Sequence, residues 1–467
     1  MFVGRSRELK VMNDLFTSDS FEMIVIYGRR RIGKTALVEE FSRGKRVLSF
    51  TPQLQADKDN LSDFSRAVAS FFGLPETTPS FASWLDALAF IADAADDERT
   101  VLVIDEFPYA CRSNNALPST FQIAIDKHFK SSNLMLVLSG SNQGFMESEV
   151  LGEKSPLYGR RTAQLKLQPL DYVDAALMMP DCPPAERISY YAALGGTPYY
   201  LEGVDASKSF ADNVASLFFL PSGRMFDEPS MLMRQELREP SMFASVMRAI
   251  ANGSNRMSEI ASATGISTGS IGFYLSTLES LGLVERIVPF GEPSRSKKGV
   301  YRVCDPAFLF WYRFVAPYVS VIERGLGEGV CRRLLESGRR NEHEGHVFET
   351  VCMQWLARRA LAHGLPLEPT AMGSWWGTDP EARQQTDIDV VASDDIDKKL
   401  LVGECKWRNS IDEGAVIAAL DHRSRLISGY GECHRYLFTK VPVSEASLER
   451  CADDGRLHFV CVDEMFE

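Results

Sequence analysis

The chain has 467 residues, of which 45% are hydrophobic and 24% are charged, a composition typical of soluble globular proteins. One hydrophobic core does not extend over a chain of this length, so we expect three or four domains. No apolar run approaches the ~18 residues that cross a bilayer. The N-terminal segment carries charges where a secretion signal needs apolar residues. These features exclude an integral membrane protein, and we expect a cytoplasmic one.

The net charge of −12 argues against a protein whose whole surface is built for nucleic acid, although it leaves room for a local basic patch. Nine cysteines are scattered along the chain, and none forms a CxxC pair. An odd number without paired spacing predicts neither a disulfide framework nor a zinc ribbon.

The first 165 residues alternate between apolar strands and amphipathic helices. This alternation predicts an α/β fold, with a parallel sheet covered by helices on both faces. The expected strands are residues 22–27, 46–50, 100–104, 134–139 and 162–167, and helices are expected at 61–72, 82–95 and 119–130.

A glycine-rich segment follows the first strand directly and leads into a helix. Its spacing is GxxxxGK[ST], from Gly28 to Thr35, in the strand–loop–helix context that a P-loop requires. Backbone amides of such a loop surround phosphates, Lys34 is expected to reach the β- and γ-phosphates, and the Thr35 hydroxyl is expected to bind Mg²⁺. The nucleotide-binding residues predicted here are Gly28, Arg31, Gly33, Lys34, Thr35 and Ala36.

Two carboxylates stand at the end of the strand 100–104. Ligands of open α/β sheets bind at the carboxyl ends of the strands. We expect Asp105 to hold Mg²⁺ through water and Glu106 to polarise the water that attacks ATP.

Polar and basic residues follow the later strands. The strand 134–139 leads into Ser141 and Asn142, and either is a candidate contact for the γ-phosphate; Asn142 is the predicted ligand. Arg160 and Arg161 are candidates for an arginine finger that acts within the chain or from a neighbouring subunit, with Arg160 the predicted one.

These pieces together resemble the archaeal-type ATPase family, within the signal-transducing ATPases related to AAA+ proteins. The resemblance covers roughly the first 240 residues and implies that the turn Gly196-Thr197-Pro198 lies near the adenine, with Pro198 as a nucleotide contact. The segments that carry it are FVGR with Glu8, GRRRIGKT, VLVIDEFPY, LSGSN, SPLYGRR and GGTPYYL.

The following region reads as helical from 168 to 240, and then as three short helices and a hairpin. Helices are expected at 241–251 and 257–264, Ser267 is expected to cap the third, and the hairpin strands are 283–290 and 300–304. This arrangement resembles a winged helix-turn-helix. Residues 241–304 hold seven Lys or Arg and four Glu, which favours DNA backbone contact. The third helix presents mainly Ser, Thr and Gly, so we expect little base specificity, or an internal brace instead of a DNA reader.

A second acidic constellation lies near the C-terminus. A hairpin centred between 396 and 397 sets Asp389 opposite Glu404, and strand alternation places Glu404 and Lys406 on one face. Two carboxylates and an amine suit Mg²⁺-dependent phosphodiester cleavage, with Asp389 and Glu404 as metal ligands and Lys406 orienting water. Glu349 is a further candidate carboxylate, and Asp387 has the same parity as Asp389, so the choice between them stays open.

This arrangement resembles the D…ExK core of restriction-endonuclease-like nucleases, and also the poorly characterised domain that accompanies archaeal-type ATPases, through GHVFE, Trp375-Trp376 and GECKW. We therefore expect four segments: an ATPase core (1–167), a helical lid (168–240), a winged helix (241–305) and a nuclease-like domain (306–467). The leading hypothesis is an ATP- and Mg²⁺-dependent protein that binds and cleaves DNA. The alternative is an ATP-controlled regulatory switch whose nuclease-like domain is inactive and docks a protein partner or a second copy.

Overall fold

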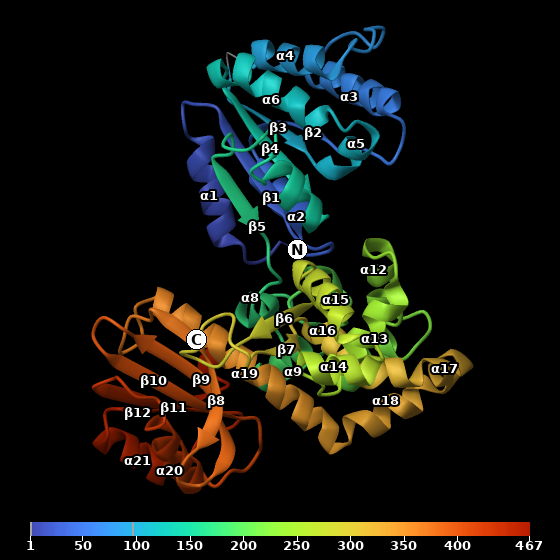
Figure 1. The fold of residues 1–467 in the computed structure, drawn as a ribbon. Coiled ribbons are helices and arrows are strands. Elements are labelled where there is room, and N and C mark those ends of the chain that lie inside the picture. The colour runs from blue at the N-terminus through green and yellow to red at the C-terminus, as the bar shows by residue number, and fades with distance from the viewer. Residues whose placement is uncertain (1, 96–97) are drawn as a thin grey trace. The chain divides into compact units, whose positions relative to one another are not determined.

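The computed structural model describes residues 2–95 and 98–467, without the side chains of residues 450–453. The chain forms two compact units (Figure 1). The first runs to Pro169 and includes Thr197–Tyr199, and the second holds Leu170–Gly196 and Tyr200–Glu467. The division into four segments remains a prediction.

Five parallel strands form the sheet of the first unit, in the order β2-β3-β4-β1-β5. The parallel sheet predicted from the sequence is confirmed. Strand β4 lies between β1 and β3, so the ends of these three strands are neighbours at one sheet edge. The strands are β1 (Glu22–Tyr27), β2 (Arg46–Phe50), β3 (Thr100–Ile104), β4 (Leu134–Gly140) and β5 (Ala163–Lys166).

Helices cover both faces of this sheet, because successive side chains of each buried strand point in opposite directions. Met23 and Val25 of β1 pack in a core with Phe64 and Trp84, whereas Ile24 belongs to a second core. The first core includes α3 (Asp57–Phe71), α4 (Trp84–Ala94), α5 (Phe107–Ser113) and α6 (Leu117–Lys127), and the second includes α1 (Ser6–Phe16) and α2 (Lys34–Ser42).

The second unit begins with short helices and a glycine turn. The turn contains Gly196. A Cβ at this position would lie 1.7 Å from the Leu170 carbonyl oxygen, so the close approach of the two backbone segments requires glycine. The helices are α8 (Tyr172–Ala176), α9 (Pro184–Leu194), α11 (Phe210–Phe218) and α12 (Glu228–Glu236), while α10 (Pro198–Leu201) starts in the first unit.

The predicted winged helix is present. It consists of α13 (Pro240–Ala251), α14 (Met257–Thr264), α15 (Thr268–Ser280) and the antiparallel strands β6 (Val284–Ile287) and β7 (Val300–Val303). The expected cap of the third helix differs in detail: Ser267 stands at the N-cap position, but its hydroxyl bonds to the Ser270 hydroxyl at 2.9 Å and caps no backbone amide.

A helical stretch then leads to a mixed sheet. Within it, α18 (Gly327–Leu335) and α19 (Gly338–Leu361) follow α16 (Pro306–Phe310), two π-helical turns (Trp311–Val315 and Ile322–Leu326) and the short α17 (Val319–Val321). The sheet order is β12-β11-β10-β9-β8, with β8 (Ala371–Asp379), β9 (Gln384–Asp394), β10 (Lys399–Lys406), β11 (Glu432–Thr439) and β12 (Leu457–Cys461). Helices α20 (Glu413–Ser424) and α21 (Glu445–Asp453) complete it. In the part of the chain that the structure describes, no helix is long and apolar enough to cross a membrane.

Candidate functional site

The backbone carbonyls of the P-loop bind the side chain of its own lysine. The Lys34 ammonium donates hydrogen bonds to the backbone carbonyls of Gly28 at 3.0 Å and Arg29 at 3.1 Å. A Cβ at Gly28 would lie 2.5 Å from the Ile32 side chain, and Gly33 has a φ of +90°, so both glycines are required by the loop's path. Helix α2 starts directly after it, with Thr35 and Ala36 exposed. The loop therefore has the cradle and the helix N-terminus that bind phosphates.

Thr35 and Asp105 meet across the sheet edge. The Thr35 hydroxyl donates to Asp105 Oδ2 at 2.8 Å, and Asp105 Oδ1 accepts from the amide of Glu106 at 3.1 Å. Asp105 is buried, with 8% of its surface exposed. The two residues predicted to bind Mg²⁺ are thus brought together by the loop after β1 and the end of β3.

Glu106 is held by the neighbouring strand β4. Its Oε2 accepts from the backbone amide of Ser141 at 3.0 Å and from the Ser141 hydroxyl at 2.9 Å. The Glu106 backbone has a φ of +57°, a left-handed conformation that is costly for a residue with a side chain and is typical of functional sites. Of the two candidates at this strand end, Ser141 contacts the carboxylate, while the Asn142 side chain accepts from the Phe145 amide at 2.9 Å and caps α7 (Gln143–Phe145).

Residues 197–199 lie against the P-loop. Arg29 donates to the Thr197 hydroxyl at 3.1 Å, and the Arg31 guanidinium stands 4.5 Å from the centre of the Tyr199 ring. Pro198 is the neighbour that a Cβ at Gly33 would meet, at 3.7 Å. The turn with Pro198, predicted to lie near the nucleotide, is therefore a direct neighbour of the loop.

Arg160 is engaged away from these residues. Its guanidinium forms a forked ion pair with Asp126, at 2.6 and 3.2 Å, and donates to the Pro156 carbonyl at 2.8 Å. Hydrogen bonds from Arg160 and Lys130 lower the pKa of Asp126 to about 2. Arg161 donates to the Leu151 carbonyl at 3.3 Å. The structure brings neither arginine to the P-loop, so the arginine finger remains a prediction.

The wing of the winged helix is basic, and its base is fixed. Arg295 and Lys297 are exposed, whereas Lys298 pairs with Glu292 at 2.6 Å. Near the base, the Phe290 amide donates to the Ser374 carbonyl at 2.8 Å, and its side chain packs in the core beneath the C-terminal sheet. On the third helix, Phe273 is 64% exposed. The wing tip is thus free to meet a partner, while its base is tied to the C-terminal domain.

The C-terminal hairpin has the predicted register. Lys399 pairs with Asp394 and Gly403 with Val390, which confirms the turn centred between 396 and 397. Beyond Val390 the ladder changes, because β9 carries a bulge at residues 389–390 opposite Ser374. At this bulge Asp389 Oδ2 accepts from the Cys405 amide at 2.7 Å. The carboxylate therefore binds backbone next to Glu404.

Glu404 is surrounded by cations. Lys406 forms an ion pair with its Oε1, and Arg423 of α20 donates to its Oε2 at 2.8 Å and to the Asp387 carbonyl at 2.9 Å. Glu404 is 4% exposed. Arg423 was not predicted from the sequence. It lies on a helix 19 positions after Glu404, and no sequence motif links the two residues.

Glu349 lies near Asp389, across from the hairpin. Burial and the negative charge of Asp389 raise the pKa of Glu349, and burial and the charge of Glu404 raise the pKa of Asp389. A polar cleft of about 640 Å³ opens beside Glu349 and Lys406. Its other charged lining residues are Arg313, Glu342, Arg408 and Lys440. Among the described residues, no group of three His, Cys, Asp or Glu side chains is arranged to hold a metal ion.

Comparisons with known proteins agree with the geometry of the first unit and the winged helix. A family model described as an ATPase domain predominantly from Archaea matches residues 2–204. A model described as a bacterial regulatory protein of the arsR family matches residues 244–286, and one described as archaea bacterial proteins of unknown function matches 311–417. The fold and site define a P-loop ATPase that carries a winged helix.

The chain is 32% identical over 442 residues to the uncharacterized protein MJECL04 of Methanocaldococcus jannaschii. The match covers 93% of this chain and 94% of that protein. The chain therefore belongs to the same family as that protein. A shorter match, 38% identical over 47 residues, links 10% of this chain to 80% of the uncharacterized ATP-binding protein MJ0423 of the same organism.

Two solved structures are similar to part of this chain. The Walker-type ATPase PABY2304 of Pyrococcus abyssi is 19% identical, with a TM-score of 0.48 over 67% of this chain and 96% of that one. The ORC2 protein of Aeropyrum pernix is 14% identical, with a TM-score of 0.40 over 68% of this chain and 95% of that one. Neither likeness bears on what this chain does.

Proposed function

We propose that this chain hydrolyses ATP and that Glu106 polarises the attacking water. The observation that carries the proposal is the meeting of the P-loop with two strand ends at one sheet edge: Thr35 contacts Asp105 at 2.8 Å, and Ser141 holds Glu106 at 2.9 Å. Ligands of open parallel sheets bind at this edge. Phosphoryl transfer needs positioning and charge stabilisation more than covalent chemistry, and this edge supplies residues for both.

Each residue has a separate task in this proposal. The Lys34 ammonium leaves the carbonyls of Gly28 and Arg29 for phosphate oxygens when the nucleotide binds. Both Ser141 bonds use Oε2 of Glu106, so the second carboxylate oxygen is the one that accepts a proton from water. The contacts of Arg29 and Arg31 with residues 197–199 fix the turn beside the loop.

The Thr35 hydroxyl and the Asp105 carboxylate suit Mg²⁺, which prefers a few protein oxygens and keeps several waters. Their direct hydrogen bond supports this assignment, because it places the two oxygens 2.8 Å apart. When bound, Mg²⁺ supplies positive charge against the β- and γ-phosphates.

Phosphate release from ATP tests the proposed activity. Wild-type protein is compared with Lys34→Ala, which removes the phosphate contact, and with Lys58→Ala, which removes an exposed lysine of α3. The proposal predicts that Lys34→Ala loses nucleotide binding and turnover while Lys58→Ala retains both. Equal turnover by wild type and Lys34→Ala would contradict it.

We further propose that ATP controls an interaction with duplex DNA, in which the wing contacts phosphates. The support is the pair Arg295 and Lys297, both exposed at the wing tip, together with a third helix that has no Lys or Arg to read guanine. Such binding depends on salt and little on sequence.

Salt titration tests this contact. The double variant Arg295→Ala, Lys297→Ala is expected to reduce the slope of log affinity against log salt by about 2, because each phosphate contact contributes ~0.9. The double variant Arg43→Ala, Lys58→Ala, with exposed residues of the first unit, is the control. An unchanged slope in the wing variant would rule out the wing as the DNA contact.

For the C-terminal domain we propose an interaction role, and DNA cleavage in a nuclease-like fold is the second candidate. The polar cleft beside Lys406, with Arg313, Arg408 and Lys440, favours a phosphate-bearing partner in either case. A divalent metal does not fit as the side chains stand, because Lys406 and Arg423 occupy both oxygens of Glu404, so no cleavage step is derived.

Incubation of linear, circular and single-stranded DNA with Mg²⁺ or Mn²⁺ separates the two roles. Cleavage by wild type that disappears in Lys406→Ala would establish the nuclease, and reactions with and without ATP would show whether the nucleotide controls it. DNA binding without cleavage by either protein would leave the interaction role.

A further inference from the structure

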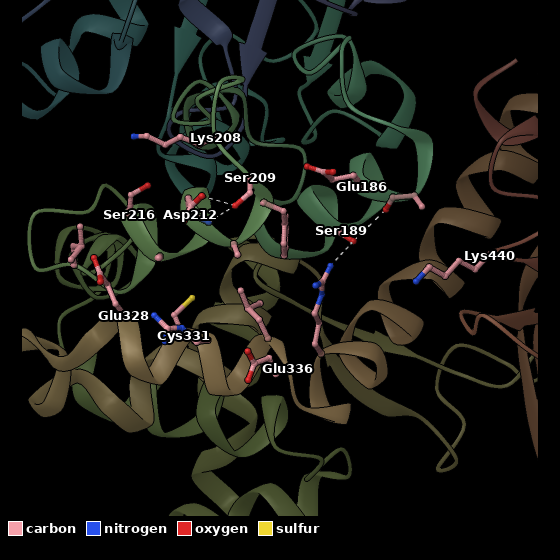
Figure 2. A pocket seen from close by; sticks show the side chains of 18 residues that line it. Glu186, Ser189, Lys208, Ser209, Asp212, Ser216, Glu328, Cys331, Glu336 and Lys440 are labelled. Carbon is pink, nitrogen blue, oxygen red and sulfur yellow. Dashed lines mark hydrogen bonds between the residues drawn. The ribbon is translucent and has the colours of Figure 1, made fainter.

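A cavity of about 900 Å³ lies in the second unit (Figure 2). Its lining includes no residue of the P-loop and none of the carboxylates of the C-terminal hairpin. Helices α9, α11 and α18 provide most of its wall, and the first turn of α19 and Lys440 complete it. A volume in this range suits a small molecule. Neither the proposed ATP hydrolysis nor DNA binding uses it.

The inner wall of the cavity is apolar. Phe210, Leu220 and Leu335 line it together with Cys331. Phe210 is 9% exposed, and the Arg340 guanidinium stands 4.6 Å from the centre of its ring. An apolar group of a ligand would gain ~25 cal/mol for each Å² that it buries on this wall.

Most cations around the cavity already have partners. Arg340 pairs with the buried Glu344 at 2.8 Å and donates to the Ser189 hydroxyl at 3.3 Å. Lys208 pairs with Asp205 at 3.3 Å, and the Lys440 ammonium stands 5.0 Å from the centre of the Trp407 ring. The two ion pairs reduce the positive charge that the cavity offers to a ligand, whereas the contact with Trp407 leaves the charge of Lys440 in place.

The carboxylates of the rim are less engaged. In the described part of the chain, Glu186, Glu328 and Glu336 form no ion pair, and Asp212 accepts a hydrogen bond from the Ser209 hydroxyl at 2.7 Å (Figure 2). Arg332 and Lys440 are the lining cations that stand against these four acids once the Lys208–Asp205 and Arg340–Glu344 ion pairs are counted as neutral. The rim therefore carries a surplus of negative charge.

A separate small void, with room for about one water molecule, lies behind this wall. It shares Phe210, Cys331 and Leu335 with the cavity and is lined further in by Phe310 and His343. His343 is 2% exposed, and its Nε2 bonds to the Ala192 carbonyl at 2.8 Å. That bond places the ring proton on Nε2, so Nδ1 is an acceptor, and it has no hydrogen-bond partner among the residues that the structure describes. A buried acceptor without a partner costs about 1–3 kcal/mol and is met by a donor group or a water.

We propose that this cavity binds a small organic cation, an ammonium group on an aromatic or aliphatic body. The body packs against Phe210, Leu220 and Leu335, and the ammonium meets the carboxylates of Glu328 and Glu336. An anionic ligand of the same size would face the acidic rim and is disfavoured by it.

Calorimetric titration of the full chain with three matched probes tests the proposal: 2-phenylethylammonium, the neutral 2-phenylethanol and the anionic 3-phenylpropanoate. We expect the ammonium to bind one per chain and at least ~10-fold more tightly than the other two, a difference equivalent to ~1.4 kcal/mol of binding free energy. The double variant Glu328→Gln, Glu336→Gln is expected to abolish this preference. Both positions are exposed, so the fold should persist, and the thermal midpoint verifies it.

The exposed Glu323→Gln, outside the cavity, is the matched control and should behave as wild type. Equal binding of the three probes would show an apolar cavity without charge selection and would overturn the proposal. It would also be overturned if the ammonium did not bind, or if it bound the double variant as tightly as wild type.

Discussion

Ser141 donates two hydrogen bonds, from its amide and its hydroxyl, to the same carboxylate oxygen of Glu106. The two residues stand at the ends of β4 and β3, which are neighbours in the first sheet. Glu106 is therefore oriented by an adjacent strand before any nucleotide arrives. Preorganisation of this kind lowers the cost of positioning during the reaction.

Loss of the Ser141 hydroxyl should reduce turnover. Ser141→Ala keeps the amide bond to Glu106 but removes the hydroxyl bond, and a hydrogen bond to a charged group is worth about 1.5–3 kcal/mol. We expect kcat to fall about tenfold with KM nearly unchanged, because the bond orients the base and does not bind ATP. Ser139→Ala on the same strand is the control, since the buried Ser139 hydroxyl has no hydrogen-bond partner in the described part of the chain. A rise in KM at constant kcat would place Ser141 in nucleotide binding instead.

The Thr35 hydroxyl should set the magnesium requirement. In Thr35→Ala, Asp105 loses the hydroxyl 2.8 Å away that the P-loop supplies. The Mg²⁺ concentration for half-maximal hydrolysis is expected to rise about tenfold or more, as is usual when an oxygen that serves a metal site is lost. Titration of hydrolysis with Mg²⁺ measures it, with Thr17→Ala at the exposed end of α1 as the control. An unchanged Mg²⁺ dependence would remove Thr35 from the metal site.

Local patterns were sufficient for several of these features. The P-loop and the five strands of the first sheet follow from apolar runs and glycine spacing. The pairing of β9 with β10, from Lys399–Asp394 to Gly403–Val390, follows from the turn composition at 393–398. Side-chain contacts between distant segments are not encoded in such patterns. The choice of Ser141 over Asn142 for Glu106, the pairing of Arg160 with Asp126 and the bulge at 389–390 depend on how elements pack. Strand β8 was not explicitly predicted, because its glycine, serine and tryptophan residues obscure the alternation of apolar and polar side chains.

Arg423 should contribute to the stability of the C-terminal domain. Arg423→Gln leaves the buried Glu404 with Lys406 as its remaining ion-pair partner, and we expect the free energy of unfolding to fall by about 1–3 kcal/mol. Arg425→Gln, from an exposed i,i+4 pair with Asp421, should cost less than ~0.5 kcal/mol. Urea denaturation measures both. The double variant Glu404→Gln, Arg423→Gln should recover part of the loss, and strict additivity would argue against a direct interaction.

Buried His343 makes stability depend on pH. Burial lowers its pKa to about 3 in the folded chain, from 6.5. Between these values the unfolded chain binds one more proton, so the free energy of unfolding falls as pH decreases through this window. Within this window the free energy of unfolding falls by up to ~1.4 kcal/mol for each pH unit, and above pH 6.5 this loss is absent.

Urea denaturation at pH 7.5 and 5.5 measures this effect. His343→Gln should lose less stability between the two values than wild type does. His363→Gln should not reduce the loss, because the nearby Glu368 raises the pKa of that exposed histidine. Equal losses in wild type and His343→Gln would contradict the assignment.

Separate measurement of ATP binding and of single-turnover hydrolysis in Glu106→Gln tests the central claim most directly. The substitution keeps the shape of Glu106 and its contact with Ser141 but removes the base. We predict a rate at least ~100-fold below wild type, with ATP affinity within about twofold. Glu76→Gln, an exposed residue of the same unit, should match wild type in both. Hydrolysis by Glu106→Gln at the wild-type rate would contradict the role assigned to Glu106, and a parallel loss of ATP affinity would make it a binding residue.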